Sequence, residues 1–110
     1  MLDTNKGLKP GQWLKSSNGK YSLHMQNDGN LVLYSQRGAI WGSGTNARSI
    51  AAVYMQADGN LVMYDTNNRP TWASNSGGGT SPKLFVQDDG NVVIYSGSKA
   101  LWATGTSGRW

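Results

Sequence analysis

Three copies of one nine-residue pattern hold most of the side chains in this sequence that could recognise a ligand. The pattern is Gln-x-Asp-Gly-Asn-x-Val-x-Tyr, and it begins at Gln26, Gln56 and Gln87. Gln and Asn offer hydrogen-bond donors and acceptors, Asp accepts strongly, and Tyr places a hydroxyl beside a ring. Val adds a small apolar patch, and a pyranose presents the complementary set of hydroxyls around C–H groups. Because none of these side chains is a nucleophile or a tuned acid–base pair, the pattern predicts recognition without enzymatic activity.

Five side chains of each copy are the candidate site residues. Alone, the Asp-Gly-Asn triplet is equally well explained as a hairpin turn, because these residues suit the left-handed backbone that such turns need. A turn does not require Gln before it, or Val and Tyr after it, three times over. We therefore expect three binding sites, formed by Gln26, Asp28, Asn30, Val32 and Tyr34; by Gln56, Asp58, Asn60, Val62 and Tyr64; and by Gln87, Asp89, Asn91, Val93 and Tyr95.

The alternation of side chains along a strand decides the length of each turn. A two-residue turn would pair Gln26 with Leu31 and bury the Gln26 amide, at a cost of about 1–3 kcal/mol. An odd-length loop instead keeps Gln26 on one outward face with Asn30, Val32 and Tyr34, so we expect an odd loop. The same alternation points three more side chains outward, as part of a subsite for a larger glycan or of an interface: His24, Tyr54 and Phe85.

A second landmark repeats with the same period. The glutamines recur after 30 and 31 residues, and Trp41, Trp72 and Trp102 recur after 31 and 30. Apolar and polar residues alternate within each unit, turn residues separate the runs, and no helical period is visible. The chain is therefore predicted to be one all-β domain over residues 1–110, with three internal repeats at roughly 10–45, 46–77 and 78–106.

The composition excludes several kinds of site. The sequence has no Cys, no Glu and one His, so we expect no disulfide, no metal centre and no cofactor. The Asp-x-Asn spacing lacks the closing Glu of an EF-hand loop. A glycosidase needs two carboxylates about 5–9.5 Å apart. Asp28, Asp58 and Asp89 lie in separate repeats, and the neighbours Asp88 and Asp89 point different ways.

Charge and hydropathy give weaker indications about partners and location. Ten Lys and Arg against six acidic residues give a net charge of +4. The basic residues are scattered, so we expect no nucleic-acid binding. No apolar run approaches the roughly 18 residues of a membrane span, and the N-terminus lacks the apolar core of a signal peptide. We expect no membrane insertion. Either the domain acts where it is made or an export segment was removed, so secreted action stays open.

The three motifs, together with the Trp-Ala-Ser and Trp-Ala-Thr segments at Trp72 and Trp102 and a looser Trp-Gly-Ser at Trp41, resemble the monocot mannose-binding lectins, the bulb-type family. The resemblance covers roughly Leu8 to Thr106. It implies a β-prism II fold, in which three four-stranded antiparallel sheets surround a pseudo-threefold axis and the three tryptophans form core structure near that axis. It also implies metal-independent binding of α-D-mannose and high-mannose glycans at several sites at once.

The resemblance assigns a role to each site residue. In the first copy Asp28 and Asn30 would hold the axial O2 of mannose, Gln26 would hold O3, and Tyr34 would hold O4. Val32 would pack against the C3–C4 edge of the ring. The second and third copies would repeat these roles at the residues listed above. The axial O2 separates mannose from glucose, and a site built to bind one hydroxyl can reject sugars that misplace it.

Two departures from the family pattern leave questions open. Many plant members carry a disulfide, whereas this chain has Gly29 and Ala51 at the matching positions. Plant members often form dimers by exchanging C-terminal strands. Residues 101–106 could do this, but the ending at 107–110 differs, and Trp110 either packs on a partner or frays. We expect a homodimer or a higher oligomer with glycans or glycoproteins as ligands. One alternative is a bacteriocin-type module that binds bacterial surface polysaccharide. The other is a structural, storage or taste-modifying relative that has lost sugar binding, which eroded motifs would mark.

Overall fold

The computed structural model describes residues 1–109, and in that range the chain forms eleven strands joined by turns. The expectation for Trp110 lies outside the described residues. Glycine and asparagine supply the left-handed backbone at most of these turns, as at Gly29, where φ is 91°. The strands are β1 (Gly7–Leu8), β2 (Trp13–Lys15), β3 (Ser22–Met25), β4 (Leu31–Ser35), β5 (Gly38–Gly42), β6 (Ile50–Met55), β7 (Leu61–Asp65), β8 (Pro70–Ala73), β9 (Lys83–Val86), β10 (Val92–Ser96) and β11 (Lys99–Ala103).

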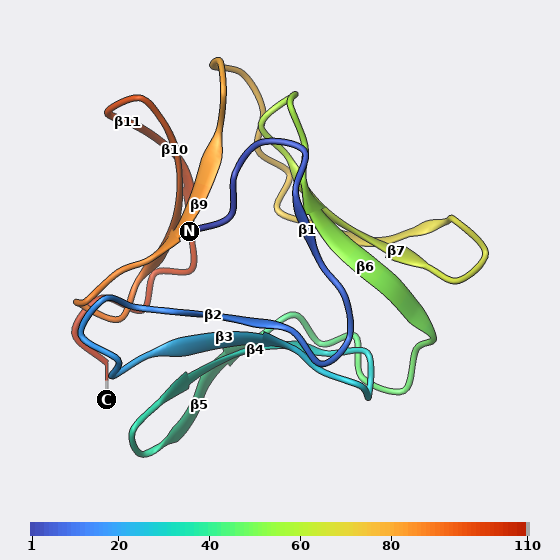
Figure 1. Ribbon diagram of the computed structural model, residues 1–110, viewed down its shortest axis with the longest axis horizontal. Helices are drawn as coiled ribbons and strands as arrows, with labels where there is room; N and C mark the ends of the chain where they lie inside the picture. Colours follow the sequence, from blue (N-terminus) through green and yellow to red (C-terminus); the bar gives the residue numbers. More distant parts are fainter. Residues whose placement is uncertain (110) are drawn as a thin grey trace.

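The strands form three antiparallel sheets that enclose a common centre (Figure 1). One sheet has the order β2-β3-β4-β5, the second has the order β1-β6-β7-β8, and the third has the order β9-β10-β11. An isolated antiparallel bridge between Leu2 and Leu84 occupies the fourth, outer position of the third sheet. The all-β, β-prism II architecture is therefore confirmed.

The N-terminal segment supplies the outer edge of every sheet. Leu2 pairs with Leu84 in the third sheet, Gly7 pairs with Tyr54 in the second, and β2 pairs with β3 in the first. The Thr4 hydroxyl also donates to the carbonyl oxygen of Pro82 at 2.7 Å. The first repeat was predicted to begin only at about residue 10, so β1 and the bridge were missed.

The register of the hairpins confirms the odd-length loop. Leu23 pairs with Leu33 and Met25 pairs with Leu31. The backbone N–H of Gln26 donates to the backbone carbonyl oxygen of Asn30 at 2.9 Å, which leaves a three-residue loop at 27–29. The inward-facing residues of all three sheets join one core, in which Leu33, Met63 and Ile94 among others are fully buried. Their burial removes apolar surface from water and drives the sheets together.

Gly29 occupies the position at which the resemblance places a disulfide cysteine. A Cβ there would lie 2.3 Å from the carbonyl oxygen of Arg48 and 2.9 Å from that of Thr45. The backbone of residues 45–48 therefore fills the space that a side chain would need. The neighbouring loop thus leaves no room for a cysteine side chain at this position.

The three repeated tryptophans meet where the sheets converge. Trp41, Trp72 and Trp102 contact one another edge to face, with ring centroids 5.8–5.9 Å apart and interplanar angles of 72–76°. Edge-to-face packing is a favoured arrangement of aromatic rings. All three rings are partly buried against the core and so hold the three sheets at one common point.

Candidate functional site

Each repeat places its polar motif on the outward face of its sheet, at a β-hairpin. We call the three clusters site 1 on β3–β4, site 2 on β6–β7 and site 3 on β9–β10; each contains its Gln, Asp, Asn, Val and Tyr as listed above. A β-bulge lies immediately before the tyrosine in every sheet, between Leu33 and Tyr34, Met63 and Tyr64, and Ile94 and Tyr95. A bulge changes the direction of the side chains beside it, and the three bulges lie at equivalent positions of the three repeats.

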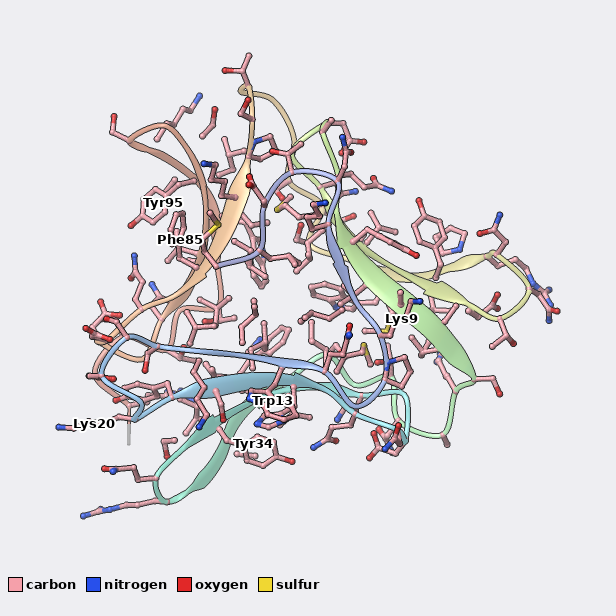
Figure 2. All side chains as sticks on the ribbon, viewed as in Figure 1. Lys9, Trp13, Lys20, Tyr34, Phe85 and Tyr95 are labelled. Atoms are coloured by element: carbon pink, nitrogen blue, oxygen red, sulfur yellow. The ribbon has the colours of Figure 1, made fainter. Side chains whose placement is uncertain are left out.

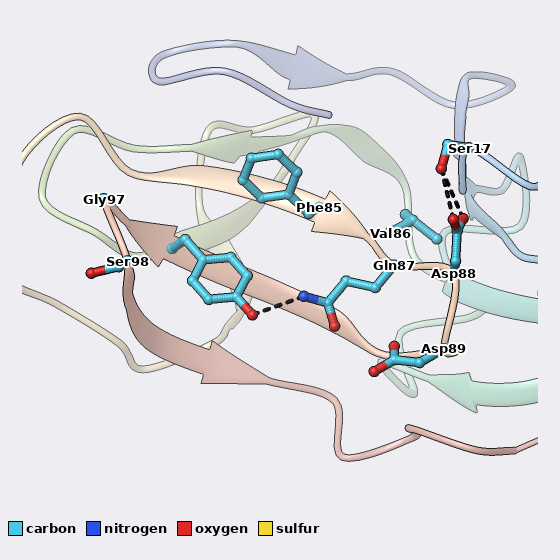
Figure 3. A pocket seen from close by; sticks show the side chains of 9 residues that line it. Ser17, Phe85, Val86, Gln87, Asp88, Asp89, Gly97 and Ser98 are labelled. Carbon is cyan, nitrogen blue, oxygen red and sulfur yellow. Dashed lines mark hydrogen bonds between the residues drawn. The ribbon is translucent and has the colours of Figure 1, made fainter.

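The glutamine and the tyrosine of each site contact each other. Gln56 Nε2 donates to the Tyr64 hydroxyl at 2.5 Å, and Gln87 Nε2 donates to the Tyr95 hydroxyl at 2.8 Å (Figure 3). At site 1 the amide orientation that satisfies both neighbours has Gln26 Oε1 accepting from the Tyr34 hydroxyl and Nε2 donating to both Asp28 oxygens at 3.2 Å. These contacts hold a side chain just past the end of one strand beside a tyrosine on the next strand of the hairpin.

The aspartate of each site is oriented by the turn that carries it. Asp28 Oδ1 accepts the backbone N–H of Asn30 at 2.9 Å, and the same bond occurs at Asp58 and Asp89. The second carboxylate oxygen differs between sites. Within residues 1–109, Asp58 Oδ2 makes no hydrogen bond, whereas Asp89 Oδ2 accepts from the Ser107 hydroxyl at 3.0 Å. Site 2 therefore offers the least engaged acceptor.

A serine or threonine that directly follows β5, β8 or β11 orients the asparagine of its repeat. At site 1 the Ser43 hydroxyl and the Gly44 N–H donate to Asn30 Oδ1, both at 3.0 Å, and the Thr45 N–H does so at 3.3 Å. The Ser43 oxygen in turn accepts the Leu31 N–H at 3.0 Å. With Oδ1 held in this way, Asn30 Nδ2 makes no hydrogen bond within residues 1–109 and remains a donor on the outward face.

In the other two repeats a hydroxyl group likewise donates to Oδ1 of the site asparagine. Ser74 donates to Asn60 Oδ1 at 3.0 Å, and Thr104 donates to Asn91 Oδ1 at 3.1 Å. These positioning residues were not predicted from the sequence. The signal was present, because Ser43, Ser74 and Thr104 stand two residues after the repeated tryptophans.

The valines lie nearly covered on the outward face. Val32 and Val62 are 5% exposed, and Val93 is 3% exposed. Each pairs across the sheet with a small residue, Gly42, Ala73 or Ala103 respectively. The apolar patch that each valine offers is therefore small, and the polar groups around it make up most of the site.

An aromatic ring stands beside each site tyrosine. His24 meets Tyr34 edge-on at a centroid distance of 5.4 Å, Tyr54 meets Tyr64 at 6.2 Å, and Phe85 meets Tyr95 at 5.9 Å. The outward orientation predicted for His24, Tyr54 and Phe85 is thus confirmed. Burial lowers the pKa of His24 below its ordinary value, and the positive charge of Lys15 lowers it further.

Site 3 continues into a hollow of about 750 Å³, which Figure 3 shows from close by. Phe85, Gln87 and Tyr95 line it, together with Asp88, whose carboxylate reaches the β2–β3 loop. The Asn18 N–H and the Ser17 hydroxyl donate to this carboxylate and hold the pKa of Asp88 below its usual value. Asp88 therefore ties the first and third sheets together beside site 3.

Two findings concern metal ions and membranes. Within residues 1–109 no three His, Asp, Glu or Cys side chains gather into a group that could hold a metal ion. No helix in the described part of the chain is long and apolar enough to cross a bilayer.

Solved structures match the chain over nearly its whole length, whereas no protein-family model and no curated protein matches it. A Marasmius oreades lectin is 31% identical, with a TM-score of 0.89 over 97% of this chain and 91% of that one. A monomeric monocot mannose-binding lectin from Gastrodia elata is 44% identical, with a TM-score of 0.86 over 96% of each chain. The mannose-specific agglutinin of snowdrop, Galanthus nivalis, complexed with methyl-α-D-mannoside, is 42% identical, with a TM-score of 0.79 over 96% of this chain and 94% of that one. The chain belongs to the monocot mannose-binding, bulb-type lectin family and is a carbohydrate-binding lectin.

Proposed function

We propose that this lectin binds α-D-mannose and high-mannose glycans through sites 1, 2 and 3. The observation that carries the proposal is the threefold recurrence of one outward cluster, in which the asparagine Nδ2 is held as a donor with no protein partner within residues 1–109. The similarity to the snowdrop agglutinin, which was solved with methyl-α-D-mannoside, supports the choice of sugar.

The hydrogen-bonding groups of site 1 suit a hydroxyl that must both accept and donate. In this proposal Asn30 Nδ2 donates to the axial O2 of mannose, and O2–H donates to the Asp28 carboxylate. Gln26 binds O3, Tyr34 binds O4, and Val32 packs against the C3–C4 edge. Glucose carries O2 in the equatorial position and would leave the Asn–Asp pair without its partner, which disfavours glucose.

Binding at sites 2 and 3 follows the same assignments at their own residues. At site 3 the Ser107 hydroxyl already donates to Asp89 Oδ2 at 3.0 Å and would share that oxygen with O2–H. We therefore propose that site 3 binds the monosaccharide more weakly than site 2. Since side chains alone supply the donors and acceptors, the proposal requires no metal ion, and chelation by EDTA should leave affinity unchanged.

Multivalency would supply the useful affinity. Each shallow site is expected to bind a monosaccharide at roughly millimolar Kd, or about −4 kcal/mol. Three sites on one 110-residue domain would raise avidity toward branched glycans. A homodimer or higher oligomer would raise it again. Strand β11 pairs with β10 of its own chain, so dimerisation by C-terminal exchange would require β11 to leave that partner.

A ¹⁵N NMR titration with methyl α-mannoside tests the proposal, with methyl α-galactoside as the control. The side-chain amides of Gln26 and Asn30, Gln56 and Asn60, and Gln87 and Asn91 report on the three sites separately. Saturable shifts at all three pairs with mannoside only are expected. No shifts at tens of millimolar mannoside (well above the expected Kd), or equal shifts with galactoside, would overturn the mannose assignment and favour larger surface polysaccharides.

A further inference from the structure

Site 1 has a neighbour that site 2 lacks. Trp13 on β2 pairs across the sheet with His24 on β3, and His24 pairs with Val32 on β4. The Trp13 and His24 rings stack with centroids 5.7 Å apart and an interplanar angle of 24°. His24 then meets Tyr34 edge-on at 5.4 Å. A continuous row of rings therefore runs from the outer edge of the sheet into site 1.

Trp13 is exposed although it is large and apolar. Its side chain is 53% exposed, and it lies on the same outward side of the sheet as Tyr34 (Figure 2). It also lines a hollow of about 390 Å³ together with Gly7, Leu8, Gly11 and Gln12. An exposed tryptophan of this kind, adjoining a polar binding site, offers a flat apolar surface that a ligand can cover.

The equivalent position beside site 2 is closed. There the outer strand presents Gly7 opposite Tyr54, and the Tyr54 ring leans over it, since a Cβ on Gly7 would lie 2.6 Å from Tyr54 Cδ1. The row of rings at site 2 therefore stops at Tyr54. Within residues 1–109 the first sheet alone stacks a tryptophan on the ring beside its site.

We propose that Trp13 and His24 form a second subsite of site 1, which takes the next pyranose of an α-linked oligosaccharide whose terminal mannose lies in site 1. The apolar C–H face of that second ring packs on Trp13, while its hydroxyls remain in water. The row Trp13–His24–Tyr34 supplies the continuity, because no gap separates the proposed subsite from the polar cluster. The inference depends on the proposed function, since it takes site 1 as the place of the terminal sugar.

The test compares methyl α-mannoside with α1→2-, α1→3- and α1→6-linked methyl mannobiosides by ¹⁵N NMR, following Gln26 and Asn30 for site 1, Gln56 and Asn60 for site 2, and the Trp13 indole N–H. At least one disaccharide is expected to bind site 1 about fivefold more tightly than the monosaccharide does, as burial of one ring face allows, with no such gain at site 2. The Trp13 indole signal should shift with that disaccharide and not with the monosaccharide.

Two variants make the test specific. Trp13→Ala should abolish the disaccharide gain at site 1 while leaving monosaccharide binding there unchanged, and Trp13→Phe should keep most of the gain. Monosaccharide shifts at Gln26 without any disaccharide gain would overturn the subsite and leave the proposed function standing. Absence of all shifts at Gln26 would overturn the proposed function at site 1, on which the subsite depends. A Trp13 signal that moves with protein concentration instead would identify a second copy of the chain as the occupant and overturn the subsite.

Discussion

Sites 1 and 2 carry the same five side chains and differ in the strand that lies beside them. In site 1 the outer strand is β2, and Trp13 stacks on His24. In site 2 the outer strand is β1, which presents Gly7 beneath the Tyr54 ring. The difference shows where the molecule is symmetric and where it is not. The repeats set the polar clusters, whereas the N-terminal segment gives each cluster its own surroundings.

This comparison separates the recognition of one sugar ring from the preference for what is attached to that ring. Recognition of one sugar ring depends on groups that recur three times, so the three sites should share it. Preference for what is attached to that ring depends on the outer strand, so the sites should differ in it. Substitutions can alter separately what the sites share and what distinguishes them.

The largest effect is expected from Asn30→Asp and, separately, from Asn60→Asp. Either change keeps the Oδ1 acceptor that Ser43 or Ser74 contacts, but it replaces the Nδ2 donor with a charged oxygen beside another carboxylate. Monosaccharide binding at the altered site should weaken by at least about 2 kcal/mol, which takes a millimolar site beyond detection. Titration followed at the remaining Gln and Asn amides measures this. Equal losses at the unaltered sites would contradict the independence of the three clusters.

A smaller effect is expected from Ser43→Ala. The change removes one donor to Asn30 Oδ1 and leaves the Leu31 N–H without its acceptor, at a cost of about 1–2 kcal/mol in the free energy of unfolding. Affinity at site 1 should fall by several fold, because Gly44 and Thr45 still hold the amide in part. Ser43→Thr is the matched control, since Thr104 fills this place in the third repeat. Urea unfolding and titration at site 1 measure both quantities.

Gly7→Ala tests the closed edge of site 2. The new Cβ would lie 2.6 Å from Tyr54 Cδ1 and 2.9 Å from the carbonyl oxygen of Val53, so the ring must swing away from β1 at a cost of about 1 kcal/mol. Gly77→Ala is the control, because its Cβ would meet only the Asp58 carbonyl oxygen at an ordinary 3.6 Å. Thermal unfolding and the Tyr54 ring signals measure the effect. Unchanged Tyr54 ring signals in Gly7→Ala would contradict the arrangement in which the Tyr54 ring covers Gly7 at the edge of site 2.

The smallest effect concerns pH and the ring beside site 1. Burial and Lys15 lower the pKa of folded His24 below the ordinary 6.5, so the unfolded chain takes up the proton first as pH falls. The free energy of unfolding should therefore decrease as the pH drops below about 6.5, and His24→Gln should remove that component. Trp13→Ala exposes the imidazole to water and should raise the pKa toward 6.5, which NMR titration of the ring measures. A lower pKa in Trp13→Ala would contradict burial as the main cause.

Much of this structure could be predicted from the repeats. The alternation of apolar and polar residues predicted the odd loop, the core face and the outward position of His24, Tyr54 and Phe85. These predictions succeeded because one face of each sheet is buried, and a slip of one residue would reverse every side chain.

The outer strands and the support of the asparagines could not be predicted in the same way. Strand β1 and the Leu2 bridge form through backbone hydrogen bonds, which leave little trace in side-chain type, and β1 is only two residues long. The part played by Ser43 depends on a bond that joins residues 13 positions apart across two strands. The periodicity shows that Trp-x-Ser/Thr recurs, but only the fold shows which atom the hydroxyl meets.

The reach of the N-terminal segment has a consequence for synthesis on the ribosome. Leu2 is made well before its partner Leu84, which follows 82 positions later, and the Tyr21 hydroxyl donates to the carbonyl oxygen of Arg109, 88 positions away. At typical elongation rates of about 5–20 residues per second, Leu2 therefore stays unpaired for several seconds while the hairpins that follow it form. Although they precede the three repeats, the residues around Leu2 are among the last to pair, and they close the domain.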